Sequence, residues 1–176
     1  MIYKLRVLLD TEKDVFRDIE VQGESNFEDL HFVILQAFGW QPHEMASFYE
    51  TNDNWDKGEE IPLMDIQEEF GPKKMPTMSD IKIEEKLERK GEKMLYVFDF
   101  YLMWCFYLEV IDIQPEQKGI EYPQLVLEVG EAPHQMDKEP VDFSGDDSDE
   151  DGGDSYEDGY NPEDYSDLDF DEYSPN

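Results

Sequence analysis

Residues 93–113 read KMLYVFDFYLMWCFYLEVIDI, and this stretch decides the fold. Seven of the twelve residues at 96–107 are aromatic. Both alternating faces of residues 93–100 and 104–113 are apolar, a pattern typical of strands that are covered on both sides. We therefore predict two strong strands here, placed in the middle of a β-sheet.

Two shorter apolar segments open the chain. Residues 2–9 and 15–21 are joined by a polar turn, which indicates a β-hairpin. The sequence Ser25-Asn26-Phe27-Glu28 predicts a capping box, with Ser25 capping the first helical turn and Glu28 reaching back to it. Behind it, apolar residues recur at helical spacing as far as Gly39, which is placed to end the helix: Phe27, Leu30, Ile34, Ala37 and Phe38.

The remaining elements are weaker. Residues 45–50 and 124–129 are typical of strands, and residues 51–77, rich in Asp, Gly, Pro and Lys, are typical of a loop. Ser79 is placed to cap a short helix that ends at Gly91. This order predicts an α+β fold: a mixed sheet with an N-terminal hairpin and one main helix packed on a face, in a β-grasp-like layout.

The composition changes near residue 137, so we predict a domain at 1–136 and an acidic tail at 137–176. Residues 144–176 contain 14 Asp or Glu and no Lys or Arg. Such a segment cannot bury enough apolar surface to offset its ordering entropy, and we expect disorder. Apolar residues are nevertheless spaced along it, which suits docking onto a basic partner as well as a purely solvating role: Tyr156, Tyr160, Tyr165, Leu168, Phe170 and Tyr173.

Charge limits the classes of partner. The formal net charge is -32, and residues 1–143 alone have 32 acidic and 14 basic residues. Such a field repels phosphate backbones and anionic lipid heads, so we expect no direct contact with nucleic acid or membrane. Basic proteins, cations or plain solubility are favoured. The start of the chain lacks a secretory pattern and residues 100–108 are too short to span a bilayer, so the expected location is the cytoplasm.

Few side chains suggest chemistry. The three histidines have no metal-ligand spacing, and Cys105 lies in an apolar run where an inert thiol is expected. Asp99, inside an aromatic segment, needs a charged or hydrogen-bonding partner, such as the amides of a turn. His31 lies one helical turn after Phe27, which favours a packing role. We expect no cofactor.

One metal pattern occurs in the tail. Asp147, Asp149 and Asp151, with Gly152 and then Asp158, nearly match an EF-hand loop. The twelfth position is aspartate instead of glutamate, and no amphipathic helix flanks the loop. Weak binding of divalent cations is expected more than a specific Ca²⁺ site.

The sequence resembles the plasmid Ri open-reading-frame-three-like proteins, also called transposon-element passenger or "TnpR-like" proteins, over about residues 1–135. The matching blocks are Tyr3-Lys4-Leu5, Asp29-Leu30-His31, Ala37-Phe38-Gly39-Trp40, residues 93–100 with Trp104, and Tyr122-Pro123. The resemblance implies an α+β fold with no established activity. Where the family often has a polar Gly-Asp-Asp-Trp-x-His block, this chain has Tyr-Leu-Met-Trp-Cys-Phe at 101–106, so no polar or metal site is carried over. His31, Trp40, Asp99 and Trp104 transfer as candidate binding positions.

Together these observations favour a non-enzymatic binding or adaptor module that acts through the tail, an aromatic groove, or both. Two alternatives remain open. The chain could mimic nucleic acid with its acidic surface, or act as a hydrolase-like or metal-dependent enzyme through Asp99 and His31. The enzyme hypothesis requires these two side chains to lie within hydrogen-bond reach in an open pocket.

Overall fold

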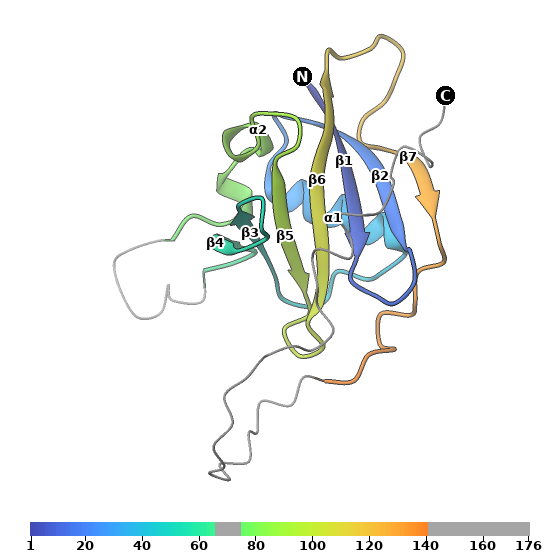
Figure 1. The fold of residues 1–176 in the computed structure, drawn as a ribbon. Helices are drawn as coiled ribbons and strands as arrows, with labels where there is room; N and C mark the ends of the chain where they lie inside the picture. Colours follow the sequence, from blue (N-terminus) through green and yellow to red (C-terminus); the bar gives the residue numbers. More distant parts are fainter. Residues whose placement is uncertain (66–74, 141–176) are drawn as a thin grey trace.

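The computed structural model describes residues 1–65 and 75–140. They form one seven-stranded sheet in the order β4-β3-β5-β6-β1-β2-β7, with α1 on one face (Figure 1). The strands are β1 (Ile2–Leu9), β2 (Phe16–Gln22), β3 (Ala46–Thr51), β4 (Lys57–Pro62), β5 (Lys93–Phe98), β6 (Trp104–Gln114) and β7 (Gln124–Val129). The helices are α1 (Phe27–Phe38), the short α2 (Ile83–Lys86) and a 3₁₀ turn, η1 (Met78–Asp80). The predicted α+β class is confirmed.

The topology differs from the prediction in one respect. Every pair of neighbouring strands among the described residues is antiparallel, so the expectation of a mixed sheet is wrong, and the β-grasp-like layout built on it is corrected as well. Parallel neighbours need a long crossover connection, whereas β1–β2, β3–β4 and β5–β6 are successive hairpins. The aromatic strands β5 and β6 do lie in the middle of the sheet, as their two apolar faces predicted.

The main helix begins one residue later than its predicted cap. Asn26, not Ser25, accepts the amide of Asp29 on its side chain (2.8 Å), and the Asp29 carboxylate accepts the amide of Asn26 (3.3 Å). Asn26 has the extended backbone of a helix cap (φ -87°, ψ 172°), whereas Ser25 lies in the preceding bend, where its amide donates to the carbonyl of Gln22 (3.1 Å) and its carbonyl accepts the amide of Ile83 (2.9 Å). Gly39 ends the helix with φ 73°, as predicted.

The strand β4 was missed, because its sequence, KGEEIP, has charges where a strand normally has apolar residues. It lies at the edge of the sheet, and charges on an edge strand prevent pairing with other molecules. The expected cap Ser79 is also corrected: Asp80 accepts the amide of Thr77 (3.0 Å), and Ser79 lies within η1.

The two faces of the sheet are covered differently. The main core lies between the sheet and α1 and includes Leu5, Phe27, Phe48 and Phe106, all 0% exposed. On the opposite face, Leu8, Phe16, Leu95 and Tyr107 form a second cluster. No helix of the described residues packs over this second face; α1 lies behind the sheet in Figure 1.

Candidate functional site

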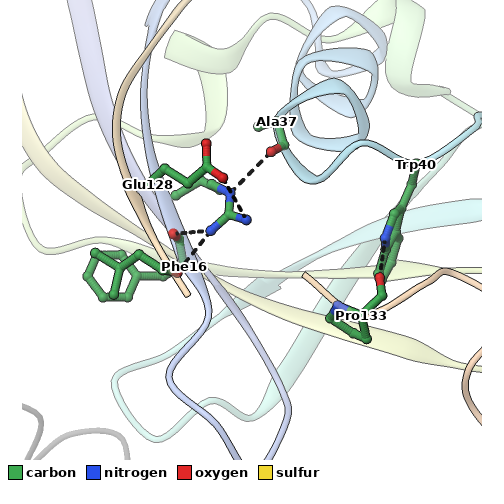
Figure 2. Close-up of polar contacts among 7 residues, drawn as sticks. Phe16, Ala37, Trp40, Glu128 and Pro133 are labelled. Carbon is green, nitrogen blue, oxygen red and sulfur yellow. Dashed lines mark hydrogen bonds and ion pairs between the residues drawn. The ribbon is translucent and has the colours of Figure 1, made fainter. Parts of the chain in front are cut away.

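The structure brings two predicted residues, Trp40 and Trp104, together at one end of the sheet. Their ring centroids lie 4.8 Å apart, and both rings are buried. The indole nitrogen of Trp40 donates to the carbonyl of Pro133 (2.9 Å), as Figure 2 shows. The indole nitrogen of Trp104 donates to the carbonyl of Gln135 (2.8 Å). The two tryptophans therefore hold residues 132–138, here called the strap, which runs from β7 toward the β5–β6 turn (Figure 1).

The strap has further attachments. The amide of Gln41 donates to the side-chain oxygen of Gln135 (2.7 Å), and the ammonium of Lys138 donates to the carbonyl of Met103 (2.6 Å). Each indole N–H already donates to a backbone carbonyl, and each ring is part of the main core. We call Trp40 and Trp104 the clasp, because their hydrogen bonds attach the strap after β7 to the rest of the domain.

We expect the Trp104→Phe variant to loosen the strap without unfolding the sheet. The phenyl ring keeps most of the packing, but the hydrogen bond to Gln135 is lost, at about 1 kcal/mol. Amide hydrogen exchange at residues 132–136 should accelerate about fivefold, because that free energy corresponds to this factor. Unchanged exchange at these amides would contradict the role of Trp104 in holding the strap. The control is Tyr101→Phe, at an exposed ring, which should leave the exchange unchanged.

His31 lies in the core between α1 and the sheet. It is 0% exposed, its Nδ1 shares a 2.6 Å hydrogen bond with the hydroxyl of Tyr96, and its ring packs beside Phe32 and Phe98. Its Nε2 is buried with no hydrogen-bond partner among the described residues. Burial lowers the pKa of His31 to about 4, so the ring is neutral at physiological pH.

Asp99 lies in the turn between β5 and β6 and is 4% exposed. Its backbone is left-handed (φ 63°), a conformation that aspartate tolerates better than most residues. Its Oδ1 accepts the amides of Tyr101 and Leu102, each at 3.0 Å. Asp99 and His31 therefore have different partners, and this buried geometry does not provide the open pocket that the enzyme hypothesis requires at these two residues.

Arg17 was not singled out from the sequence, although its buried side chain makes several polar contacts beside α1. It is 2% exposed, and its guanidinium donates to the carbonyls of Ala37 (3.1 Å), Phe16 (2.9 Å) and Val129 (2.9 Å) (Figure 2). Its NH2 lies 3.5 Å from the carboxylate of Glu128. Arg17 thus fixes the C-terminal end of α1 against β7, across β2.

A groove opens along α1 on the side that faces β7. Two hollows, of about 290 and 360 Å³, share Val33 and Pro123 in their walls and so form one continuous surface. The side chains along it are mainly apolar: Ile19, Val21, Leu30, Phe32, Val33, Ala37, Ile83, Pro123 and Leu125. Phe32 and Leu125 remain 45% and 44% exposed. This α1–β7 groove contains none of the predicted site residues, and its apolar lining with two exposed side chains makes it a candidate binding site.

Other chemistry is poorly supported in the described part of the chain. Cys105 is half-buried, and burial together with Asp10 raises the pKa of its thiol to about 12, so it is a weak nucleophile at neutral pH. No cluster of three or more metal-ligating side chains occurs within residues 1–65 and 75–140. None of the helices in these ranges is long and apolar enough to cross a membrane. The EF-hand-like pattern lies outside the described residues.

The fold and groove define an α+β protein with a single antiparallel sheet, a main helix on one face and an apolar channel beside an edge strand. The model of the plasmid pRiA4b ORF-3-like protein family matches residues 1–140. The chain therefore belongs to that family, as its sequence resemblance indicated.

A solved structure shares this fold. The chain is similar to a protein of unknown function from Methanosarcina mazei Go1, with a TM-score of 0.66 and 20% identity, over 78% of this chain and 74% of that one. No curated protein matches the chain significantly. These comparisons establish family and fold, and they name no activity.

Proposed function

We propose that the chain is a non-enzymatic protein-binding module whose α1–β7 groove takes an extended, partly apolar segment of a basic partner. The observation that carries the proposal is the pair Phe32 and Leu125, two large apolar side chains nearly half exposed, one in each of the two adjoining hollows of the groove. Complete burial of one such side chain contributes about 1.5–3 kcal/mol, so a partner that covers these side chains gains binding free energy.

The edge strand beside the groove favours an extended partner. Within the described residues, β7 pairs only with β2, so its outer edge offers backbone donors and acceptors. A peptide that adds as a further strand gains main-chain hydrogen bonds and places alternate side chains into neighbouring pockets. Leu125 faces α1 across the groove, because it is paired with Ile19 of the core. The groove and the edge therefore form one combined surface.

The surrounding charge favours a basic partner. Asp29 of α1 lines the same hollow as Phe32, and the side chain of Glu128, near the C-terminal end of β7, is 58% exposed. Residues 1–143 have 32 acidic and 14 basic residues. Such a field attracts cations and raises the association rate, an effect that salt weakens.

A peptide library selected on the immobilised full chain tests the proposal. We expect enriched peptides with alternating apolar residues and flanking Lys or Arg. Leu125→Asp should weaken their binding about 10- to 100-fold, in line with the loss of one buried leucine contact. Met136→Asp, at a more exposed methionine (62%) outside the groove, should leave the affinity unchanged.

The backbone contribution is tested with peptides that are N-methylated at alternate residues. In an added strand, only every second amide of the peptide bonds to β7. Methylation of that set of amides should therefore abolish binding, whereas methylation of the other set should be tolerated. Selected peptides that bind Leu125→Asp as well as the parent chain, or a library that yields no enrichment, would contradict the groove as the binding site.

A further inference from the structure

The larger hollow of the α1–β7 groove combines a buried interior with an exposed apolar rim. It measures about 360 Å³, and the buried part of its lining comes from β2, α1 and α2: Val21, Leu30 and Ile83. Phe32 (45% exposed), Val33 and Pro123 supply apolar surface that solvent reaches. A cavity of about 150 Å³ is enough to hold benzene, so this hollow has room for an aromatic side chain.

The ring of Phe32 is held in place on one side. Its centre lies 5.0 Å from the ring centre of His31, at a tilt of 57°. His31 is itself fixed in the core, where its Nδ1 shares a 2.6 Å hydrogen bond with the hydroxyl of Tyr96. A ring that is already fixed loses little rotamer freedom when a partner packs on it, and aromatic pairs gain more than their buried area alone provides. Phe32 is therefore prepared to receive a second ring.

Asp29 is the single charged residue among those that line the two hollows. It is exposed, and its Oδ2 accepts the amide of Asn26 (3.3 Å) in the capping box of α1. Its Oδ1 makes no hydrogen bond or ion pair with the rest of residues 1–65 and 75–140. This oxygen can accept an N–H from an ammonium or guanidinium group. The hollow thus has an apolar interior with one anionic acceptor at its rim.

The spacing of Phe32 and Asp29 fits an extended partner. They are three residues apart on α1, so they lie on one face with Cβ atoms about 5–6 Å apart. In a strand, the side chains of residues i and i+2 share a face and lie about 7 Å apart, because each residue rises about 3.3 Å. A partner whose ring packs on Phe32 therefore brings the side chain two residues away close to Asp29.

We propose that the larger hollow is the anchor pocket of the groove for an aromatic side chain of the partner, and that Asp29 selects a lysine or arginine two residues from this anchor. The proposal rests on the proposed function and adds a recognition motif to it, an aromatic and a basic residue separated by one position. Asp29 acts here through direct contact, in addition to the general acidic field, and is a specificity-determining residue.

Two synthetic peptides, titrated onto the full chain by calorimetry, test the anchor. They are acetyl-Thr-Leu-Thr-Phe-Thr-Lys-Thr-amide and the same residues in reverse order, and in each the leucine, phenylalanine and lysine share one face of a strand. We expect one order to bind better, because β7 has a direction. Exchanging its phenylalanine for leucine should weaken binding about 2- to 10-fold, the contribution of one aromatic pair. On Phe32→Leu the two versions should bind alike.

The variant Asp29→Asn tests the selection of the basic residue. Asparagine keeps a side-chain oxygen for the amide of Asn26, so the start of α1 is preserved. The variant should weaken the lysine peptide about 2- to 5-fold, the effect of one exposed ion pair, and leave unchanged a peptide with norleucine in place of lysine. The matched control is Glu28→Gln, in the same helical turn but outside the lining of the hollow, which should retain the preference for lysine.

The outcomes separate this proposal from the proposed function. Equal binding of the phenylalanine and leucine versions, or a preference for lysine that survives Asp29→Asn, would overturn the anchor pocket and its selector. A loss of this preference in Glu28→Gln as large as in Asp29→Asn would also overturn it, because the field would then act from a distance. In these cases weaker binding to Leu125→Asp would still support the groove. Binding that Leu125→Asp leaves unchanged, or no binding of either peptide, would contradict both proposals.

Discussion

Replacing Arg6 by methionine is expected to destabilise the domain by about 3–5 kcal/mol, a large share of the stability of a domain of this size. Arg6 and Asp18 are 3% and 0% exposed and face each other across β1 and β2. Two parallel hydrogen bonds join them, Nε to Oδ1 at 2.7 Å and NH2 to Oδ2 at 2.8 Å. The variant leaves the Asp18 carboxylate buried without its bidentate partner, and urea unfolding measures the loss.

The double variant Arg6→Met with Asp18→Leu separates this cause from lost packing. A buried ion pair replaced as a whole by apolar residues is often neutral, because both desolvation penalties disappear together. We therefore expect most of the lost stability to return. A double variant as unstable as Arg6→Met alone would show that the guanidinium acts through packing on Phe16 instead of through Asp18.

Acidification is expected to remove about 3 kcal/mol through His31 alone, since its pKa falls from an ordinary 6.5 to about 4 on folding. Between pH 6.5 and about pH 4, His31 is protonated in the unfolded chain but stays neutral in the folded chain. The contribution is therefore complete above pH 6.5, declines as the pH falls toward 4, and declines no further below that. The cause is burial among aromatic rings with no hydrogen-bond partner at Nε2.

The measurement is the free energy of unfolding from pH 7.5 to 4, compared with that of His31→Gln. Glutamine can still bond to Tyr96 but does not titrate, so the difference between the two chains should shrink as the pH falls through this window. His43→Gln, at an exposed loop position, should follow the parent chain. A constant difference between the parent and His31→Gln would contradict the neutral, buried state of the histidine.

The sequence predicted the central part of the fold well, for physical reasons. Strands β5 and β6 are apolar on both faces, and Gly39 stands where a left-handed residue ends α1. The antiparallel pairing of β1 with β6 was not predictable in the same way, because it joins segments about a hundred residues apart and leaves no local pattern. The edge strand β4 was missed because its charges protect an edge and do not resemble a core strand.

The candidate site was predicted less well. Trp40 and Trp104 do meet, but their indoles bind the backbone of the strap. Arg17 alternates with Ile19 and Val21, and a basic residue on the apolar side of a strand is the signal that could have revealed it. The α1–β7 groove has no sequence signature, because its walls come from distant segments whose residues are otherwise ordinary core formers.

Hydrogen exchange of the full chain, with and without a library-selected peptide, tests the binding function most directly. The account predicts that the peptide slows exchange at alternate amides of β7, whose outer edge it occupies, and at amides near Phe32 and Val33 of α1. Protection confined to other surfaces, with β7 exchanging as fast as in the free chain, would contradict the proposal that this groove and edge strand form the binding site.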